Sequence, residues 1–152
     1  DGFVYSVSNR GGNVSRKLFT YSSEWSYLDD GSNQGSSWSG VDFDDSTWSG
    51  GVGQFGYGEG DENTVISYGS NSNNRHVTTY FRKQFYLRDP DSVNSMVIGL
   101  VRNDACAVFL NGKEVFRDSS LNDNAQYNTL SSTDLFEEDY QINAYVVIKG
   151  WC

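Results

Sequence analysis

The stretch Ala107–Phe116, "AVFLNGKEVF", decides the fold class. At its centre stands Asn111-Gly112, the residue pair that best fits a two-residue type I′ turn. On both sides of this pair the side chains alternate with a period of two, as in a strand with one buried face. The residues that alternate are Val108, Leu110 and Val115 with Phe109, Glu114 and Phe116. The pattern predicts a β-hairpin.

Similar period-two patterns recur along the chain, and stretches with a helical period and plausible caps are nearly absent, which predicts an all-β protein. With 152 residues the chain is long enough for one domain with a real core. The Gly/Ser/Asp-rich region 29–75 is expected to form short turns anchored by Trp38, Phe43, Trp48 and Phe55. Further strands are expected at "RKLFTY" (16–21), "EWSYLD" (24–29), "TTYFRKQFYL" (78–87), "SMVIGLV" (95–101) and "YQINAYVVI" (140–148).

Charge and composition limit the partners of this protein. A net charge of −9 excludes nucleic acid and disfavours an anionic membrane surface, because both would repel the chain. No apolar run approaches the roughly 20 residues that cross a bilayer. The first residue is Asp rather than Met, which suggests a mature chain from which a signal peptide was removed. We therefore expect an extracellular protein, secreted or on a cell surface.

The two cysteines, Cys106 and Cys152, leave two alternatives open. They are a buried thiol and a terminal thiol, or they form one disulfide that ties the C-terminus to a core strand of a secreted chain. The sequence also contains one N-glycosylation sequon, at Asn13–Ser15. Its expected position in a turn would suit a glycan acceptor at Asn13.

Several motifs, in order, resemble the galactose-binding-domain-like jelly rolls appended to secreted hydrolases and surface proteins. The resemblance covers roughly residues 16–151. The motifs are "EWSYLDDGSNQGSSW" (24–38), "FDDSTWSGG" (43–51), "GQFGYGEGDENTVISYG" (53–69), "TTYFRKQFYL" (78–87) and "NDACAVFLNGKEVFRD" (103–118). The resemblance implies a jelly-roll β-sandwich of two antiparallel sheets, often with a structural calcium ion, used as a non-catalytic carbohydrate-binding or adhesive module.

The chain departs from this family at two places. It has Asp104-Ala105-Cys106 where similar sequences have Asp-Gly-Ala. It also stops at Cys152, where such domains continue into a final strand. We therefore predict an N-terminal strand-like extension and hinge over residues 1–14, followed by a sandwich over residues 15–152 that lacks its own last strand.

Catalysis is not expected. The single histidine, His76, is predicted at a turn entering a strand, and no Ser or Cys lies in a nucleophile motif. The acidic clusters could supply hard oxygen ligands for calcium, or they could cap turns and remain solvated. The candidate metal residues are Asp42, Asp44, Asp45, Glu59, Asp61 and Glu62.

A glycan site would need aromatic faces beside planar polar side chains. Exposed loop aromatics meet this requirement better than Trp25, Trp38 and Trp48, which are assigned to the core. The candidate glycan-binding residues are Tyr57, Tyr68, Glu59, Asp61, Asn74, Arg75 and His76.

A jelly roll without its last strand exposes a groove of unpaired backbone groups, which invites strand addition. The spare strand "FVYSVS" is followed by the hinge "NRGGN", and we predict that it completes the sandwich of a neighbouring subunit, which generates a filament. Two alternatives stay open: the strand folds back within its own chain, or the missing strand belongs to a longer polypeptide. The candidate donor residues are Phe3, Val4, Tyr5, Ser6, Val7 and Ser8.

Two functions therefore remain. One is a non-catalytic structural subunit that assembles with copies of itself outside the cell. The other is a carbohydrate-binding module, either free-standing or part of a larger glycan-active secreted protein.

Overall fold

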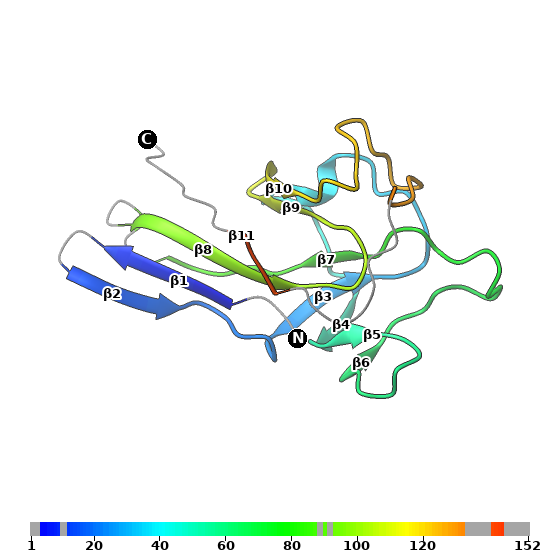
Figure 1. The fold of residues 1–152 in the computed structure, drawn as a ribbon, viewed down its shortest axis with the longest axis horizontal. Helices are drawn as coiled ribbons and strands as arrows, with labels where there is room; N and C mark the ends of the chain where they lie inside the picture. The colour runs from blue at the N-terminus through cyan, green and yellow to red at the C-terminus, as the bar shows by residue number, and fades with distance from the viewer. Residues whose placement is uncertain (1–3, 10–11, 88–89, 91–92, 133–140, 145–152) are drawn as a thin grey trace.

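The computed structural model describes residues 4–9, 12–87, 90, 93–132 and 141–144 (Figure 1). These residues form an essentially all-β protein whose sheets are mainly antiparallel, which confirms the predicted all-β class, while the jelly-roll topology stays a prediction. One short 3₁₀ helix, η1, spans Ser37–Ser39. Among the described residues, no helix has the length and apolarity that a membrane crossing requires. The strands are β1 (Val4–Asn9), β2 (Gly12–Lys17), β3 (Glu24–Leu28), β4 (Ser49–Val52), β5 (Phe55–Gly56), β6 (Thr64–Val65), β7 (Tyr80–Arg82), β8 (Val93–Val101), β9 (Ala107–Leu110), β10 (Lys113–Arg117) and β11 (Gln141–Ala144).

The largest sheet has the order β11-β8-β1-β2, and every neighbouring pair in it is antiparallel. The N-terminal strand β1 lies inside this sheet, with Val4 opposite Gly99 and Ser8 opposite Ser95 of β8. In Figure 1, β1, β2 and β8 extend to the left as an arm, away from the other strands. We call these three strands the arm. The predicted strand "FVYSVS" is thus a central strand over its described residues.

The core lies on one face of β8. Met96, Ile98 and Leu100 are buried, and their spacing of two follows the alternation of side chains along a strand. Partly buried apolar side chains from the flanking segments pack against Met96 and Ile98. They are Leu18, Phe19, Phe85, Leu87, Val108, Leu110 and Val115. The apolar run predicted as a strand at 95–101 is therefore the strand around which the core forms.

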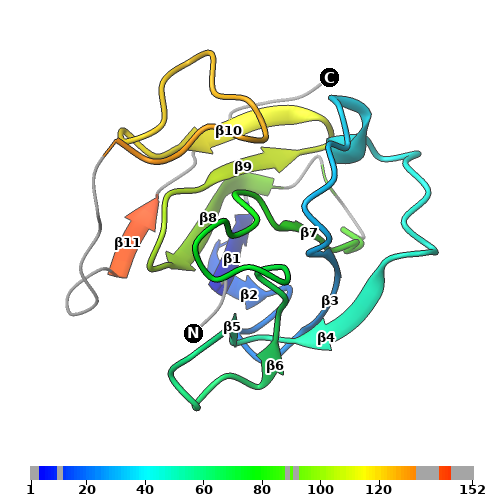
Figure 2. The ribbon, with the colours of Figure 1, turned by 90° about the vertical axis from the view of Figure 1, so that its right-hand side faces the viewer.

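The remaining strands form small sheets: β4-β3-β7, the β9–β10 hairpin and the parallel pair β5–β6. The hairpin confirms the prediction made from Asn111-Gly112, because Asn111 has φ +51° and Gly112 has φ +80°, and Lys113 pairs with Leu110. A type I′ turn needs positive φ at both central residues. Figure 2 faces the right-hand end of Figure 1, where most of the loops between the short strands gather.

Two predicted strands differ from those observed. The segment 78–87 contributes only β7, because beyond it Lys83 donates its Nζ to the carbonyl of Glu24, at 2.6 Å, and Phe85 turns into the core. The segment 16–21 overlaps only the end of β2, since pairing with β1 places the strand at Gly12–Lys17. Asn13 therefore lies in a strand, not in the predicted turn, and the predicted boundary after residue 14 falls inside β2.

One buried guanidinium, that of Arg82 on β7, fastens the loop between η1 and β4. The side chain is only 9% exposed, and its Nε donates to the carboxylate of Asp45 at 3.2 Å. The Nη1 group donates to the carbonyls of Trp38 and, at 3.0 Å, Gly40, and the guanidinium lies 5.1 Å from the ring centre of Phe43. A single side chain thereby holds a loop without regular structure on the sheet.

We expect Arg82→Met to lower the free energy of unfolding by about 3–5 kcal/mol, because it leaves the Asp45 carboxylate without its partner. Arg82→Lys should recover little of this loss, since an ammonium cannot reproduce the planar fork of donors. Urea unfolding followed by tryptophan fluorescence measures both changes. Arg75→Met, at an exposed position, is the control and should cost less than about 1 kcal/mol. An Arg82→Met protein with the parent's unfolding midpoint would contradict this role.

Candidate functional site

Three of the seven predicted glycan-binding residues lie together on the surface. The rings of Tyr57 and Tyr68 have their centroids 4.9 Å apart with an interplanar angle of 56°. The Cζ of Arg75 lies 5.4 Å from the centre of the Tyr57 ring and 5.3 Å from that of Tyr68. We call these three residues the tyrosine–arginine cluster. It offers two aromatic rings and the N–H donors of an exposed guanidinium, the groups that recognise a sugar ring and its hydroxyls.

The loops around the cluster are held from inside by His76. Its Nδ1 lies 2.7 Å from the carbonyl oxygen of Asp29, and its backbone N–H donates to the carbonyl of Tyr68 at 3.0 Å. The imidazole lies against Gly31 and Gly69, where an added Cβ would come within 2.6 Å and 2.7 Å of ring atoms. Both glycines also have positive φ, so no other residue suits these positions. His76 thus helps to position Tyr68.

The remaining glycan candidates are Asn74, Glu59 and Asp61. Asn74 and Glu59 are exposed, and the backbone N–H of Asn74 donates to the carbonyl of Asn71 at 3.0 Å. Asp61 is exposed in the loop between β5 and β6.

The carboxylate of Glu62 closes its own loop. Its Oε1 accepts from the N–H of Glu59 and its Oε2 from the N–H of Gly60, both at 2.9 Å. These backbone hydrogen bonds hold the pKa of Glu62 below its usual value, because they stabilise the charged form. Both oxygens of the Glu62 carboxylate accept backbone N–H groups, which makes them less available to coordinate a calcium ion.

Two carboxylates of the second set of metal candidates also have partners within the chain. Asp44 accepts the N–H of Ser46 at 3.0 Å, and hydrogen bonds from Ser46 lower its pKa, while Asp45 pairs with Arg82. Over the part of the chain that the structure describes, no group of three or more His, Cys, Asp or Glu side chains could hold a metal ion. The predicted structural calcium ion therefore stays a hypothesis from the motifs.

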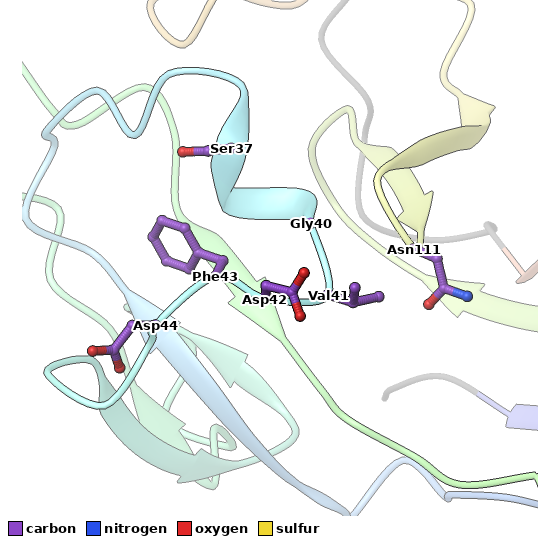
Figure 3. Close-up of a pocket in the computed structure, with 7 residues that line it drawn as sticks. All are labelled: Ser37, Gly40, Val41, Asp42, Phe43, Asp44 and Asn111. Carbon is purple, nitrogen blue, oxygen red and sulfur yellow. The ribbon is translucent and has the colours of Figure 1, made fainter.

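A surface hollow of about 580 Å³ lies between the loop after η1 and the turn of the β9–β10 hairpin (Figure 3). Val41 is 59% exposed, and its side chain is directed toward Asn111 across the hollow. The hollow is open and shares no residue with the tyrosine–arginine cluster. Sequence analysis assigned Asn111 only to the turn and did not predict that it lines a hollow. The lining residues are Ser37, Gly40, Val41, Asp42, Phe43, Asp44 and Asn111.

A buried ion pair that sequence analysis did not predict lies beside the hairpin. Arg102 and Asp118 pair through side chains that are 8% and 5% exposed, and Asp118 also accepts the hydroxyl of Ser120 at 2.9 Å. The N–H of Asp118 donates to the carbonyl of Cys106 at 2.9 Å. Burial raises the pKa of the Cys106 thiol to about 12. Cys152 lies outside the described residues, so the proposed disulfide stays a prediction.

Comparison of the chain with protein-family models, with curated proteins and with solved structures finds no match. The fold and the geometry described above define an all-β protein of mainly antiparallel sheets. The resemblance to galactose-binding-like jelly rolls therefore remains a hypothesis from the motifs.

We expect Cys106 to react slowly with iodoacetamide in the folded protein, because the thiolate is the nucleophile and its pKa is about 12. In a Cys152→Ser variant, the rate should rise about tenfold per pH unit between pH 8 and pH 11. Unfolding in urea should raise the rate at pH 8 by about a thousandfold, since the ordinary thiol pKa is 9.0. Mass spectrometry measures the rates, and rapid labelling of the folded protein at pH 8 would contradict the buried state.

The same shift sets the sign of a pH effect on stability. Below pH 9 the thiol is neutral in both states and contributes no pH dependence. Between pH 9 and about 12 only the unfolded chain gains thiolate, so this contribution to stability is lost as the pH rises.

Proposed function

We propose that this protein is a non-catalytic, extracellular structural subunit that assembles into a polymer by strand donation between jelly-roll domains. The observation that carries the proposal is the position of β1. This N-terminal strand fills the place between β8 and β2 in the arm, which extends away from the other strands (Figure 1). In the single chain the ladder forms within one subunit. The same ladder can form between two subunits, because exchange of an identical element preserves all its contacts.

The physical need for β1 supports this proposal. Without it, one edge of β8 would expose its backbone donors and acceptors beside the buried side chains of Met96 and Ile98. Some copy of β1 must therefore cover β8, either from the same chain or from a neighbour. Donation from each subunit to the next does not close on itself unless the rotation happens to close, so it produces a filament.

A designed disulfide distinguishes the two arrangements. Ser8 lies directly opposite Ser95 in the β1–β8 ladder, so Ser8→Cys/Ser95→Cys should oxidise to a cross-strand disulfide. We make the change in a chain whose own cysteines are replaced by alanine. Donation between subunits predicts a ladder of covalent multimers in non-reducing electrophoresis of assembled material, whereas folding within one chain predicts a monomer band.

The control is Val7→Cys/Ser95→Cys, because neighbouring residues of a strand lie on opposite faces and should not cross-link. Deleting residues 1–12 should abolish polymers, as seen by light scattering and electron microscopy, and leave an aggregation-prone monomer. A stable, soluble deletion product, or only monomeric cross-linked chains, would defeat the donation proposal.

The tyrosine–arginine cluster favours a second candidate, a carbohydrate-binding module of the galactose-binding-like class. A sugar ring would stack on the tyrosine rings while the Arg75 guanidinium donates to its hydroxyls. Because Arg75 already lies over both rings, a sugar ring would have to displace it from at least one ring face. The ligand would be a neutral or cationic glycan, since the protein repels polyanions.

We expect Tyr57→Ala to weaken binding to any polysaccharide that the parent binds at least tenfold, because one stacked ring is a typical recognition hot spot. Isothermal titration against a polysaccharide panel measures the affinity, and circular dichroism checks the fold. Tyr86→Ala is the matched control, since Tyr86 is 84% exposed and outside the cluster. Failure of every panel member to bind the parent at millimolar concentration would sink the carbohydrate hypothesis.

A further inference from the structure

The side-chain amide of Asn111 is exposed at the turn of the β9–β10 hairpin, where it lines the surface hollow (Figure 3). Over the described part of the chain, this amide makes no hydrogen bond. Asn111 is also the one asparagine in the sequence that is followed by glycine. Because Gly112 has no Cβ, no side chain hinders the approach of its backbone nitrogen to the amide carbon of Asn111. An unpaired amide therefore lies beside an accessible backbone nitrogen.

Several asparagines in the loops differ, because their side chains have partners within the chain. The Oδ1 atoms of Asn33, Asn71 and Asn122 each accept the N–H of the residue two positions later, at 2.9, 3.0 and 2.9 Å. These Asx turns hold the side-chain carbonyl in place. The amide nitrogen of Asn63 donates to the carbonyl of Gly53 at 2.8 Å. A residue with a side chain follows each of these four asparagines, which hinders the approach of the next backbone nitrogen.

The pair Asp30-Gly31 could close the same kind of ring, but the fold restrains it. Both the N–H and the hydroxyl of Ser32 donate to Oδ1 of Asp30, at 2.8 and 2.6 Å. The imidazole of His76 also lies against Gly31. At Gly112, by contrast, an added Cβ would have no atom outside the neighbouring residues nearer than 3.8 Å. The hairpin turn thus combines a free amide with open space.

We propose that Asn111 is a site of spontaneous deamidation, which introduces aspartate or isoaspartate into the hairpin turn of the folded protein. The backbone nitrogen of Gly112 attacks the side-chain carbonyl carbon of Asn111. A C–N bond forms and closes a succinimide ring, and the bond to the amide nitrogen breaks. Ammonia leaves with the proton that the attacking nitrogen loses. Ring closure requires rotation of the Asn111 backbone, so it occurs when the exposed turn opens locally.

Water then adds to one of the two carbonyl carbons of the succinimide and opens the ring. The net reaction consumes one water and releases one ammonia, so it needs no oxidant, reductant or enzyme. Attack at the side-chain carbonyl gives aspartate, and attack at the main-chain carbonyl gives isoaspartate. The reaction also needs no second copy of the chain, so it is independent of the proposed assembly.

The two products differ in their effect on the fold. Aspartate leaves the main chain unchanged, and Asp-Gly also suits a type I′ turn. Isoaspartate adds one CH₂ group to the backbone of a turn that has only two residues. Because the hairpin carries Val108, Leu110 and Val115 to the core, isoaspartate should lower the stability of the protein. Both products add a carboxylate to the hollow that Asp42 and Asp44 line.

Peptide mapping by mass spectrometry tests the proposal on the full chain, after incubation of the folded protein at pH 8 and 37 °C. We expect Asn111 to be converted at least tenfold faster than any other asparagine, with fragmentation locating the change within each peptide. In water labelled with oxygen-18, the product should carry the heavy isotope. The rate should rise between pH 7 and pH 9, because the attacking nitrogen must lose its proton. Conversion of another asparagine as fast as Asn111 would overturn the proposal.

Three variants complete the test. Asn111→Gly removes the amide but leaves Gly-Gly, which suits a type I′ turn, so it should keep the parent's Tm and abolish the reaction. Asn71→Gly is the matched control in another exposed loop and should leave the rate at Asn111 unchanged. Asn111→Asp should keep the parent's Tm, whereas the isoaspartate fraction, isolated by ion exchange, should melt at a lower temperature. An isoaspartate fraction with the parent's Tm would contradict the effect on the turn.

Discussion

The backbone of β8 has to be paired along both of its edges, and most of the structure depends on this requirement. The strand carries the buried side chains of Met96, Ile98 and Leu100, so the core cannot form unless β8 is held in place. One edge is covered by the short strand β11 and the other by the N-terminal strand β1. Because β1 comes from the start of the chain, the core is completed by a segment that is distant in sequence. That dependence is the physical basis of the proposed strand donation.

A few buried cations organise the parts that lack regular structure. Arg82 joins carbonyl groups and a carboxylate from the loop after η1, and Arg102 pairs with Asp118 beside the hairpin. Buried charges are tolerated only when they are paired and hydrogen-bonded. The loops rich in Gly, Ser and Asp have few apolar side chains besides aromatic anchors such as Trp38 and Trp48, which pack near Tyr80, so directional contacts to the sheets add to this packing. The same arrangement gives the Asp45 carboxylate a partner within the chain.

The elements that the sequence predicted correctly are those whose signals lie within a few neighbouring residues. The Asn111-Gly112 turn, the alternating run at β3 and the apolar run at β8 each carry their pattern within about ten residues. The strand β2 was misplaced because Gly12 and Asn13 favour turns, and only pairing with β1 makes them part of a strand. In the segment after β7, apolar and polar residues alternate as in a strand. There, however, Phe85 packs against the core and Lys83 donates to the carbonyl of Glu24, and the β7 ladder is not extended.

The candidate site likewise combines features that can be predicted from the sequence with contacts that depend on the tertiary structure. The pattern of neighbouring residues is enough to predict the all-β class, and composition gives the net charge of −9 and the aromatic residues available in the loops. Only the tertiary structure decided that Tyr57, Tyr68 and Arg75 meet, and that His76 lies between two glycines. In the folded chain, Glu62 and Asp44 also accept backbone N–H groups, and Asp45 pairs with Arg82. The reason is that turn types and alternation are written in neighbouring residues, whereas contacts between loops depend on how strands far apart in the chain are paired.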